Sequence, residues 1–118
     1  SAAAGYPSAN YSAYCASKAA LTMWTECLAD EAARHGVKVL AYHPGTVRTG
    51  MTEYSAGQPE KDNPIVNFIR DAFEEGSDTP IERSVESLVF VASGGADHLP
   101  GVQIDVDVDH NEWNTRPF

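Results

Sequence analysis

The chain has 118 residues, of which 42% are hydrophobic and 21% charged, and its formal net charge is −9. These values indicate one folded domain, residues 1–118, and exclude a disordered tail. The sequence contains no run of about 18 apolar residues, as a membrane-spanning helix needs, and no signal peptide opens it. Because the excess charge is negative, nucleic acid and anionic membranes are poor partners. We expect a soluble, cytoplasmic protein.

The first half of the chain is expected to contain one long helix and one strand. Residues 1–10 are small or turn-forming, so we expect irregular structure there and an upstream element outside this sequence. Residues 12–35 carry apolar side chains every three or four positions and are expected to form a helix that Gly36 ends. Its apolar arc is broad, which predicts contacts with both a sheet and another helix. Residues 37–42 are expected to form a buried strand, closed by Pro44-Gly45.

Both cysteines, Cys15 and Cys27, lie in the expected helix, 12 residues apart, which is too far for a disulfide. They indicate reduced thiols in a reducing compartment. We assign Cys15 to packing rather than to nucleophilic chemistry because it is a small residue inside a helix.

A loop is expected over 46–62 because glycine and proline recur there. The helix that follows has Asn63 as its N-terminal cap and Pro64 in its first position. Its apolar face is regular, and Gly76 ends it.

A last helix and a last strand are expected near the C-terminus. Thr79 is expected to cap the helix, with Pro80 in the first position and Glu82 completing a capping box. This helix is expected to run to about Ala92, before the Ser-Gly-Gly that breaks the chain. Alternating apolar residues predict a strand over 102–108.

This order of elements predicts a strand, a helical crossover and a second, parallel strand, which form one βαβ unit of an open α/β sheet. Two strands cannot bury apolar side chains on both faces. We therefore expect the sheet to be incomplete.

Tyr14 and Lys18 form the sequence Y-C-A-S-K at the start of the long helix. Residues four apart share one face of a helix, about one turn from each other. A free phenol has a pKa of about 10, so it exchanges protons poorly at neutral pH. A fixed ammonium one turn away favours the phenolate, and this predicts an acid/base tyrosine.

The wider pattern resembles the C-terminal half of a short-chain dehydrogenase/reductase of the single-domain branch. That family has a serine, then Tyr-x-x-x-Lys, then a strand that ends in Pro-Gly-x-Val-x-Thr. The matching residues are Ser1, Tyr14, Lys18, Pro44, Gly45, Val47 and Thr49. The stretch over 81–106 also resembles the last helix and strand of the family. The resemblance implies the C-terminal, catalytic half of a Rossmann-like doubly wound parallel sheet, whose N-terminal nucleotide half is absent from this sequence.

The resemblance also implies a role for each matching residue. Tyr14 exchanges a proton with the substrate oxygen, Lys18 assists Tyr14 and binds the nicotinamide ribose, and Ser1 polarises the substrate oxygen. Pro44 and Gly45 shape the turn under the nicotinamide.

The remaining two matching residues complete the expected coenzyme contacts. The Val47 backbone and the Thr49 hydroxyl hold the nicotinamide carboxamide. The implied reaction interconverts an alcohol and a carbonyl with NAD or NADP as cofactor, on a small-molecule substrate.

The sequence departs from the family pattern in three ways. It has no glycine-rich phosphate-binding turn and no residue that chooses between NAD and NADP. It also lacks the asparagine that the family uses in its proton relay. The Asp-Gly-Gly expected after the last strand is replaced by the alternating Asp-Val run over 105–109.

A second interpretation is a truncated, inactive chain that acts only by association through helix 12–35. A homo-oligomer through this helix is expected in either case, because the absent strands would leave apolar side chains exposed. By itself the chain is then expected to be molten, aggregated or dimeric. A two-domain epimerase or dehydratase also shares Tyr-x-x-x-Lys, but the Pro-Gly-x-Val-x-Thr pattern argues against it.

Other conspicuous residues favour ordinary structural roles. The aspartates over 105–109 lack the glycine and glutamate of a calcium-binding loop, and the asparagine sequon at 10–12 reads as coincidence without a secretory signal. No metal site is expected from the four histidines, whose spacing is not that of ligands: His35, His43, His98 and His110. Four residues fall where the family has its substrate lid: Met51, Tyr54, Phe68 and Phe73. For Phe68 and Phe73 a place in an ordinary helix core is expected equally.

Overall fold

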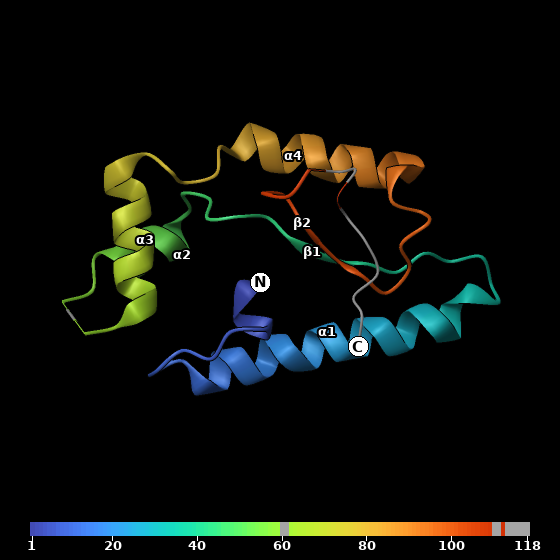
Figure 1. The fold of residues 1–118 in the computed structure, drawn as a ribbon, viewed down its shortest axis with the longest axis horizontal. Coiled ribbons are helices and arrows are strands. Elements are labelled where there is room, and N and C mark those ends of the chain that lie inside the picture. Colours follow the sequence, from blue (N-terminus) through green and yellow to red (C-terminus); the bar gives the residue numbers. More distant parts are fainter. Residues whose placement is uncertain (60–61, 110–111, 113–118) are drawn as a thin grey trace.

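The computed structural model describes residues 1–59, 62–109 and 112, and Figure 1 shows their arrangement. Helices lie on both sides of a short parallel sheet, so the predicted α/β class is confirmed. The described elements, in chain order, are the 3₁₀ turn η1 (Ala2–Ala4), α1 (Ser12–Ala33), β1 (Ala41–His43), α2 (Gly50–Ala56), α3 (Pro64–Glu75), α4 (Ile81–Phe90), the π-helical turn η2 (Val91–Gly95) and β2 (Gln103–Asp105).

The sheet consists of β1 and β2, which pair in parallel with Tyr42 opposite Ile104. Three helices, α2, α3 and α4, form the crossover between the two strands. In Figure 1 the sheet lies between α1 and α4, while α2 and α3 stand together beyond the carboxyl end of β1. Because ligands of open α/β sheets bind at the carboxyl ends of the strands, this arrangement places α2 and α3 beside the expected site.

The core gathers around β2 and the turn before it. Ala96, Leu99, Val102 and Ile104 are buried together, and Leu40, Tyr42 and Val91 pack against them. The hydroxyl of Tyr42 donates to the carbonyl of Ser84 over 2.8 Å, which ties β1 to α4. Burial of apolar area in this cluster holds η2 and the turn before β2 against the two strands.

Helix α1 buries small and hydroxyl-bearing residues rather than its largest apolar ones. Thr22, Thr25 and Ala29 are buried, and the two threonine hydroxyls donate to carbonyls one turn earlier in the helix. Met23 and Trp24 are 55% and 59% exposed. The predicted contact with the sheet is therefore made by a narrow small-residue face, and the broad apolar arc is left at the surface.

Two expectations about the elements before α3 are wrong. The loop expected over 46–62 contains α2, whose N-terminus is closed by a reciprocal capping box between Thr49 and Thr52. The segment expected to be irregular over 1–10 contains η1, in which the backbone nitrogen of Ala4 donates to the carbonyl of Ser1.

Both strands are shorter than expected. The strand expected over 37–42 spans Ala41–His43. It is short because β1 pairs only with the three residues of β2. The strand expected over 102–108 ends at Asp105, whose carboxylate accepts a hydrogen bond from the backbone nitrogen of Asp107 over 2.9 Å. This local bond turns the chain out of the sheet.

The expected cap of α4 is also wrong. Pro80 occupies the capping position, and no side chain caps this helix. The hydroxyl of Thr79 accepts instead from the backbone nitrogen of Thr46, 3.0 Å away in a distant turn. The Thr79 hydroxyl thus binds a residue of a distant turn instead of a backbone nitrogen in the first turn of α4. The cap of α3 is confirmed, since Asn63 accepts from the backbone nitrogens of Ile65 and Val66.

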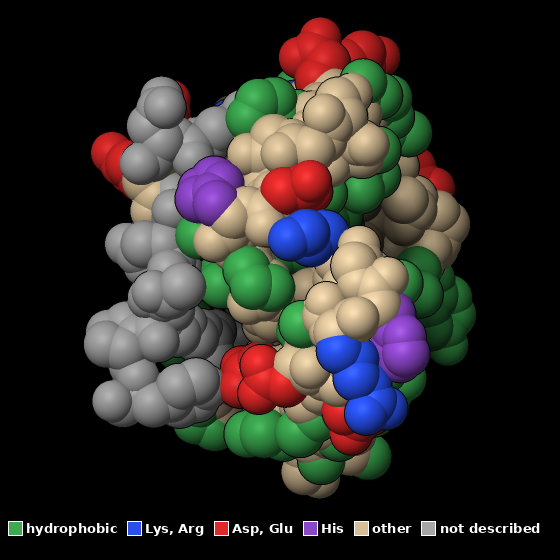
Figure 2. Space-filling view, turned by 90° about the vertical axis from the view of Figure 1, so that its right-hand side faces the viewer, with side chains coloured by type: hydrophobic (Ala, Val, Ile, Leu, Met, Phe, Trp, Pro, Cys, Tyr) green, Lys and Arg blue, Asp and Glu red, His purple; other side chains and the backbone are tan. Residues whose placement is uncertain are grey.

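On the face that Figure 2 shows, acidic and basic side chains are interspersed among hydrophobic ones, so the net charge does not gather there into one patch. Within the described part of the chain, no helix combines the length and the apolar character that a membrane span needs.

Candidate active site

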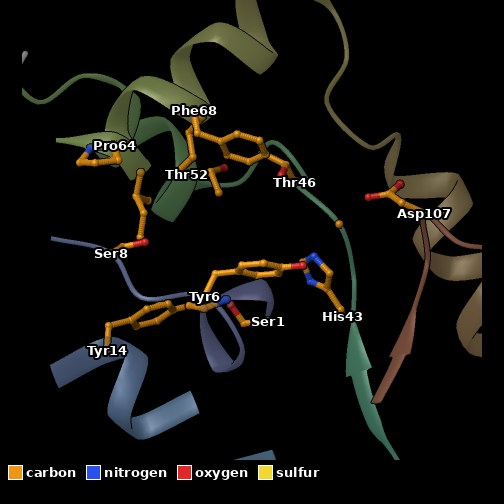
Figure 3. A pocket seen from close by; sticks show the side chains of 14 residues that line it. Ser1, Tyr6, Ser8, Tyr14, His43, Thr46, Thr52, Pro64, Phe68 and Asp107 are labelled. Carbon is orange, nitrogen blue, oxygen red and sulfur yellow. Dashed lines mark hydrogen bonds between the residues drawn. The ribbon is translucent and has the colours of Figure 1, made fainter. Parts of the chain in front are cut away.

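A cavity of about 440 Å³ opens between η1, the carboxyl end of β1 and the α2–α3 pair (Figure 3). Three of the residues predicted for the site line it, namely Ser1, Tyr14 and Gly45. Phe68, one of the candidate lid residues, also lines it. Residues that were not predicted for the site line it as well, among them Tyr6, Ser8, His43, Thr46, Thr52 and Asp107. Segments far apart in the sequence therefore converge on one hollow.

Tyr14 stands in the first turn of α1, where its ring is reached by two neighbours. The ammonium nitrogen of Lys18 lies 5.3 Å from the ring centroid, so the two side chains share one face of the helix as predicted. The ring of Tyr11 meets that of Tyr14 edge-on, with the centroids 6.1 Å apart. Both contacts restrict the orientation of a phenol that faces the cavity.

Lys18 lines a second cavity, of about 230 Å³, between α1 and β1. Ser1 lines this cavity as well as the larger one, so it stands where the two meet. Its hydroxyl oxygen accepts a hydrogen bond from the backbone nitrogen of Ala3 over 3.3 Å. That bond orients the hydroxyl and leaves its proton available for a ligand.

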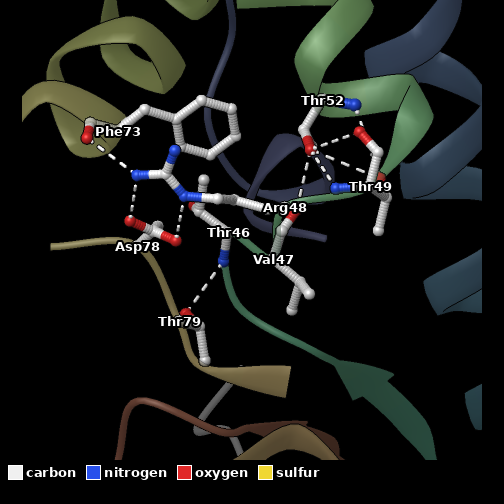
Figure 4. A network of polar contacts seen from close by, with 8 residues as sticks. All are labelled: Thr46, Val47, Arg48, Thr49, Thr52, Phe73, Asp78 and Thr79. Atoms are coloured by element: carbon white, nitrogen blue, oxygen red, sulfur yellow. Dashed lines mark hydrogen bonds and ion pairs between the residues drawn. The ribbon is translucent and has the colours of Figure 1, made fainter. Parts of the chain in front are cut away.

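The turn after β1 is held tightly against the loop before α4 (Figure 4). Gly45 has a φ of +80°, and a β-carbon at this position would lie 2.1 Å from the hydroxyl oxygen of Thr79. The backbone nitrogen of Thr79 donates to the carbonyl of Thr46 over 3.0 Å. Only glycine fits here, because both the conformation and the space exclude a side chain.

Val47 and Thr49 follow this turn, and neither lines the cavity, nor does Pro44. The hydroxyl of Thr52 donates to the carbonyl of Val47 over 2.7 Å, and the Thr49 hydroxyl accepts from the backbone nitrogen of Thr52. Thr52 itself lines the cavity. Sequence reasoning missed this residue, although the Thr-x-x-Thr spacing of the capping box could have indicated it.

Arg48, which lies between Val47 and Thr49 in the sequence, makes three hydrogen bonds through its guanidinium (Figure 4). Its Nε and Nη2 donate to the two carboxylate oxygens of Asp78 over 2.8 and 2.9 Å. The same Nη2 donates to the carbonyl of Phe73 over 2.7 Å. These hydrogen bonds hold the pKa of the Asp78 carboxyl below its usual range.

His43 is the last residue of β1 and lines the cavity. Its Nδ1 is buried and finds no hydrogen-bond partner among the described residues. Burial lowers the pKa of its imidazole below the usual value, and the negative charge of Asp105 opposes that effect. His43 is therefore a neutral imidazole at pH 7, with one ring nitrogen that lacks a protein partner within the described chain.

The four residues expected in a lid or a core have different positions. Phe68 lines the cavity. The ring of Phe73 lies under the Arg48 guanidinium, and its centroid is 4.3 Å from the guanidinium carbon. Met51 and Tyr54 are exposed and do not line the cavity.

Cys15 and Cys27 are free thiols, and Cys15 donates to the carbonyl of Tyr6. In the part of the chain that is described, no three histidine, cysteine, aspartate or glutamate side chains gather as metal ligands would. His110 lies outside the described residues.

Comparison with known proteins adds independent evidence. Residues 1–60 match a family model described as short chain dehydrogenase. The L-xylulose reductase of Caenorhabditis elegans is 32% identical over 102 residues, 86% of this chain and 39% of the relative. The human L-xylulose reductase is 30% identical over 98 residues, 83% of this chain and 38% of the relative.

A bacterial relative shows the same partial match. The oxidoreductase UcpA of Salmonella typhimurium is 36% identical over 101 residues, covering 80% of this chain and 37% of the relative. The chain thus spans less than two fifths of the length of the curated relatives it matches.

Proposed function

Because this chain belongs to the short-chain dehydrogenase family, we propose that the protein containing it is an oxidoreductase that interconverts an alcohol and a carbonyl compound with NAD(H) or NADP(H). One observation carries the proposal: Ser1 and Tyr14 line the same cavity, and the Lys18 ammonium lies one helical turn from the phenol. These three side chains are the ones that a proton exchange with a substrate oxygen requires.

Tyr14 acts as the acid in carbonyl reduction and as the base in alcohol oxidation. Its hydroxyl gives a proton to the substrate oxygen, or takes one from it, within the cavity. The positive charge of Lys18 stabilises the negative charge that develops on the phenol oxygen while the proton is exchanged. The Ser1 hydroxyl donates to the same substrate oxygen and stabilises the negative charge that develops there.

These residues supply donors suited to the nicotinamide and ribose end of a dinucleotide. The Lys18 ammonium would donate to the ribose hydroxyls, and Pro44 and Gly45 would shape the turn beside the nicotinamide. The Val47 backbone and the Thr49 hydroxyl would hold the carboxamide, although Thr52 already engages the Val47 carbonyl over 2.7 Å. When bound, the dinucleotide supplies or accepts the hydride.

The substrate proposal comes from the relatives and from the cavity wall. L-xylulose reductases are named for a small ketose, and the cavity carries hydroxyls of Ser8, Thr46 and Thr52 beside the rings of Tyr6 and Phe68. A small polyhydroxylated carbonyl compound can use the hydroxyls as hydrogen-bond partners and the rings as an apolar wall. L-xylulose is therefore the first substrate to test.

The decisive assay follows the ultraviolet absorbance of NADH and NADPH while the protein is given L-xylulose and then other small ketoses and aldehydes. We expect consumption of one of the two coenzymes that depends on the carbonyl substrate. An absence of turnover with the whole series, in a folded preparation that binds the coenzyme, would contradict the proposal.

A second candidate function is association of two copies through α1. The exposed fractions of Leu21, Met23 and Trp24 are 48%, 55% and 59%, so a continuous part of this helix presents large apolar side chains. Sedimentation velocity tests it with Trp24→Glu and, as the control, Val85→Glu on α4, which is 51% exposed. We expect the first variant alone to shift the protein towards monomer. A monomeric unsubstituted protein would contradict this candidate.

A further inference from the structure

The guanidinium of Arg48 makes hydrogen bonds to two different segments, helix α3 and the loop before α4. Nε and Nη2 bind both carboxylate oxygens of Asp78, at 2.8 and 2.9 Å, and Nη2 also donates to the Phe73 carbonyl over 2.7 Å. The guanidinium carbon lies 4.3 Å from the centroid of the Phe73 ring. A planar fork of donors is needed for this combination, and a lysine ammonium cannot reproduce it.

The Phe73 carbonyl lies in the last turn of α3, where helix carbonyls lack partners within the helix. The carbonyl of Ala72, one residue earlier, is satisfied by the backbone nitrogens of Gly76 and Ser77. Arg48 does the same for Phe73 from outside the helix. A cation at this end also interacts favourably with the helix dipole.

Helix α3 forms one wall of the candidate cavity through Ile65, Phe68 and Ile69. It is joined to α2 by Arg70, which donates to the carbonyls of Ala56 and Gln58 over 3.2 and 2.8 Å. Arg70 therefore connects α2 to α3, so the position of α3 also affects the Thr52 that α2 adds to the wall.

The adjoining wall is the turn after β1, which supplies Gly45 and Thr46, the latter beside Phe68, and from which Arg48 extends (Figures 3 and 4). Arg48 thus connects the two walls directly. The side chain of Arg48 is 49% exposed and that of Asp78 is 16% exposed. The Arg48–Asp78 ion pair contributes little to the free energy of unfolding, because water screens an ion pair of this exposure. This screening does not reduce the effect of the pair on the position of the cavity walls to the same extent.

We propose that Arg48 and Asp78 are a positioning pair that fixes the α3 wall against the turn after β1 and thereby sets the affinity for the carbonyl substrate. This inference rests on the proposed function for the identity of the ligand. Neither residue lines the cavity, so the pair acts through Phe68, Ile65 and Thr46 rather than by contact with the substrate.

The test uses the protein that contains this chain and compares Arg48→Lys and Asp78→Asn, each alone and together, with Arg34→Gln as the control. Arg34 follows the end of α1, is exposed and bonds only its neighbour His35 among the described contacts. We expect KM for L-xylulose to rise about tenfold in each single variant while kcat stays within about threefold. The double variant should be no worse than either single one, because both remove the same connection. Arg34→Gln should leave both constants unchanged.

A stability role alone predicts a different result. It would lower the amount of folded enzyme, so the apparent kcat would fall while KM stayed constant. Unchanged KM in Arg48→Lys and Asp78→Asn would therefore overturn the positioning role in an enzyme that reduces L-xylulose.

Hydrogen–deuterium exchange of the same variants gives a readout that needs no activity. We expect faster exchange of amides in α3 and in the turn over 45–49, with α1 and α4 unchanged. Equal exchange in variant and unsubstituted protein would overturn the connection itself. If the unsubstituted protein shows no reductase activity, the proposed function fails together with the substrate part of this inference, and exchange alone decides whether the pair fixes α3.

Discussion

The hydroxyl of Thr79 lies 3.0 Å from the backbone nitrogen of Thr46, and the backbone nitrogen of Thr79 lies 3.0 Å from the carbonyl of Thr46. This double connection brings the loop before α4 against the turn after β1. It occupies the space that a side chain on Gly45 would need, since a β-carbon there would meet the Thr79 hydroxyl at 2.1 Å. The shape of the candidate site therefore depends on a glycine and a threonine that are neighbours only in the folded chain.

Gly45→Ala is expected to destabilise the fold more than Gly36→Ala. Both glycines have positive φ, +80° and +71°, but an added β-carbon at Gly36 meets no atom within 4 Å. The control loses about 1 kcal/mol from its conformation alone, and Gly45→Ala loses about 1–3 kcal/mol more from the collision with Thr79. Urea denaturation of both variants measures the difference. Equal losses would show that Thr79 moves aside freely.

Lys18→Ala is expected to lower both turnover and coenzyme affinity. The ammonium lies 5.3 Å from the Tyr14 ring centroid and is proposed to contact the ribose as well as to favour the phenolate. Steady-state kinetics with a coenzyme titration separate the two effects. If the variant loses coenzyme affinity but keeps its kcat, Lys18 takes no part in the proton exchange and serves only in coenzyme binding.

Because the imidazole of His43 is buried, we expect the stability of the fold to decrease as the pH falls. Burial holds the folded pKa of its imidazole below the ordinary value of 6.5, with Asp105 opposing this effect. The unfolded chain therefore binds more protons than the folded one from about pH 6.5 down through the folded pKa, and stability decreases across that window. Above this pH window, His43 does not make the stability depend on pH.

The measurement is the free energy of unfolding between pH 7 and pH 5, compared in His43→Asn and in the exposed control His35→Asn. We expect the dependence on pH to flatten only in His43→Asn. A slope that is the same in the unsubstituted protein and in both variants would contradict the assignment.

Residues 1–118 by themselves are expected not to bind NAD(H) or NADP(H) measurably. The pyrophosphate of a dinucleotide binds at a glycine-rich turn and the adjoining helix N-terminus. This sequence contains no such turn. The coenzyme contacts proposed for it involve only the nicotinamide and ribose end. Isothermal titration calorimetry tests this directly, and micromolar affinity for either coenzyme would contradict it.

Local patterns predicted the elements whose determinants lie close together in the sequence. The Asn63-Pro64 start of α3 and the shared helix face of Tyr14 and Lys18 both follow from spacing of a few residues. The cap of α4 did not follow, because the Thr79 hydroxyl has a partner in a turn 33 residues earlier.

The roles of the site residues stay predictions. The resemblance to a known family implied seven of them, of which Ser1, Tyr14 and Gly45 line the cavity. It did not indicate Arg48 with Asp78, 30 residues apart, because an ion pair between distant loops leaves no periodic signal. Helix α2 was missed because a seven-residue helix that begins with glycine resembles a loop in composition.

The central claim is that Tyr14 exchanges the proton with the substrate oxygen, and kinetics of Tyr14→Phe in the protein that contains this chain test it most directly. The substitution removes one oxygen and keeps the ring that Tyr11 and Lys18 contact. We expect kcat to fall at least about a hundredfold, as for other general acid–base groups, while coenzyme affinity changes at most a few-fold. The control Tyr11→Phe should keep its activity. A Tyr14→Phe enzyme with near-native turnover on every accepted substrate would contradict the account.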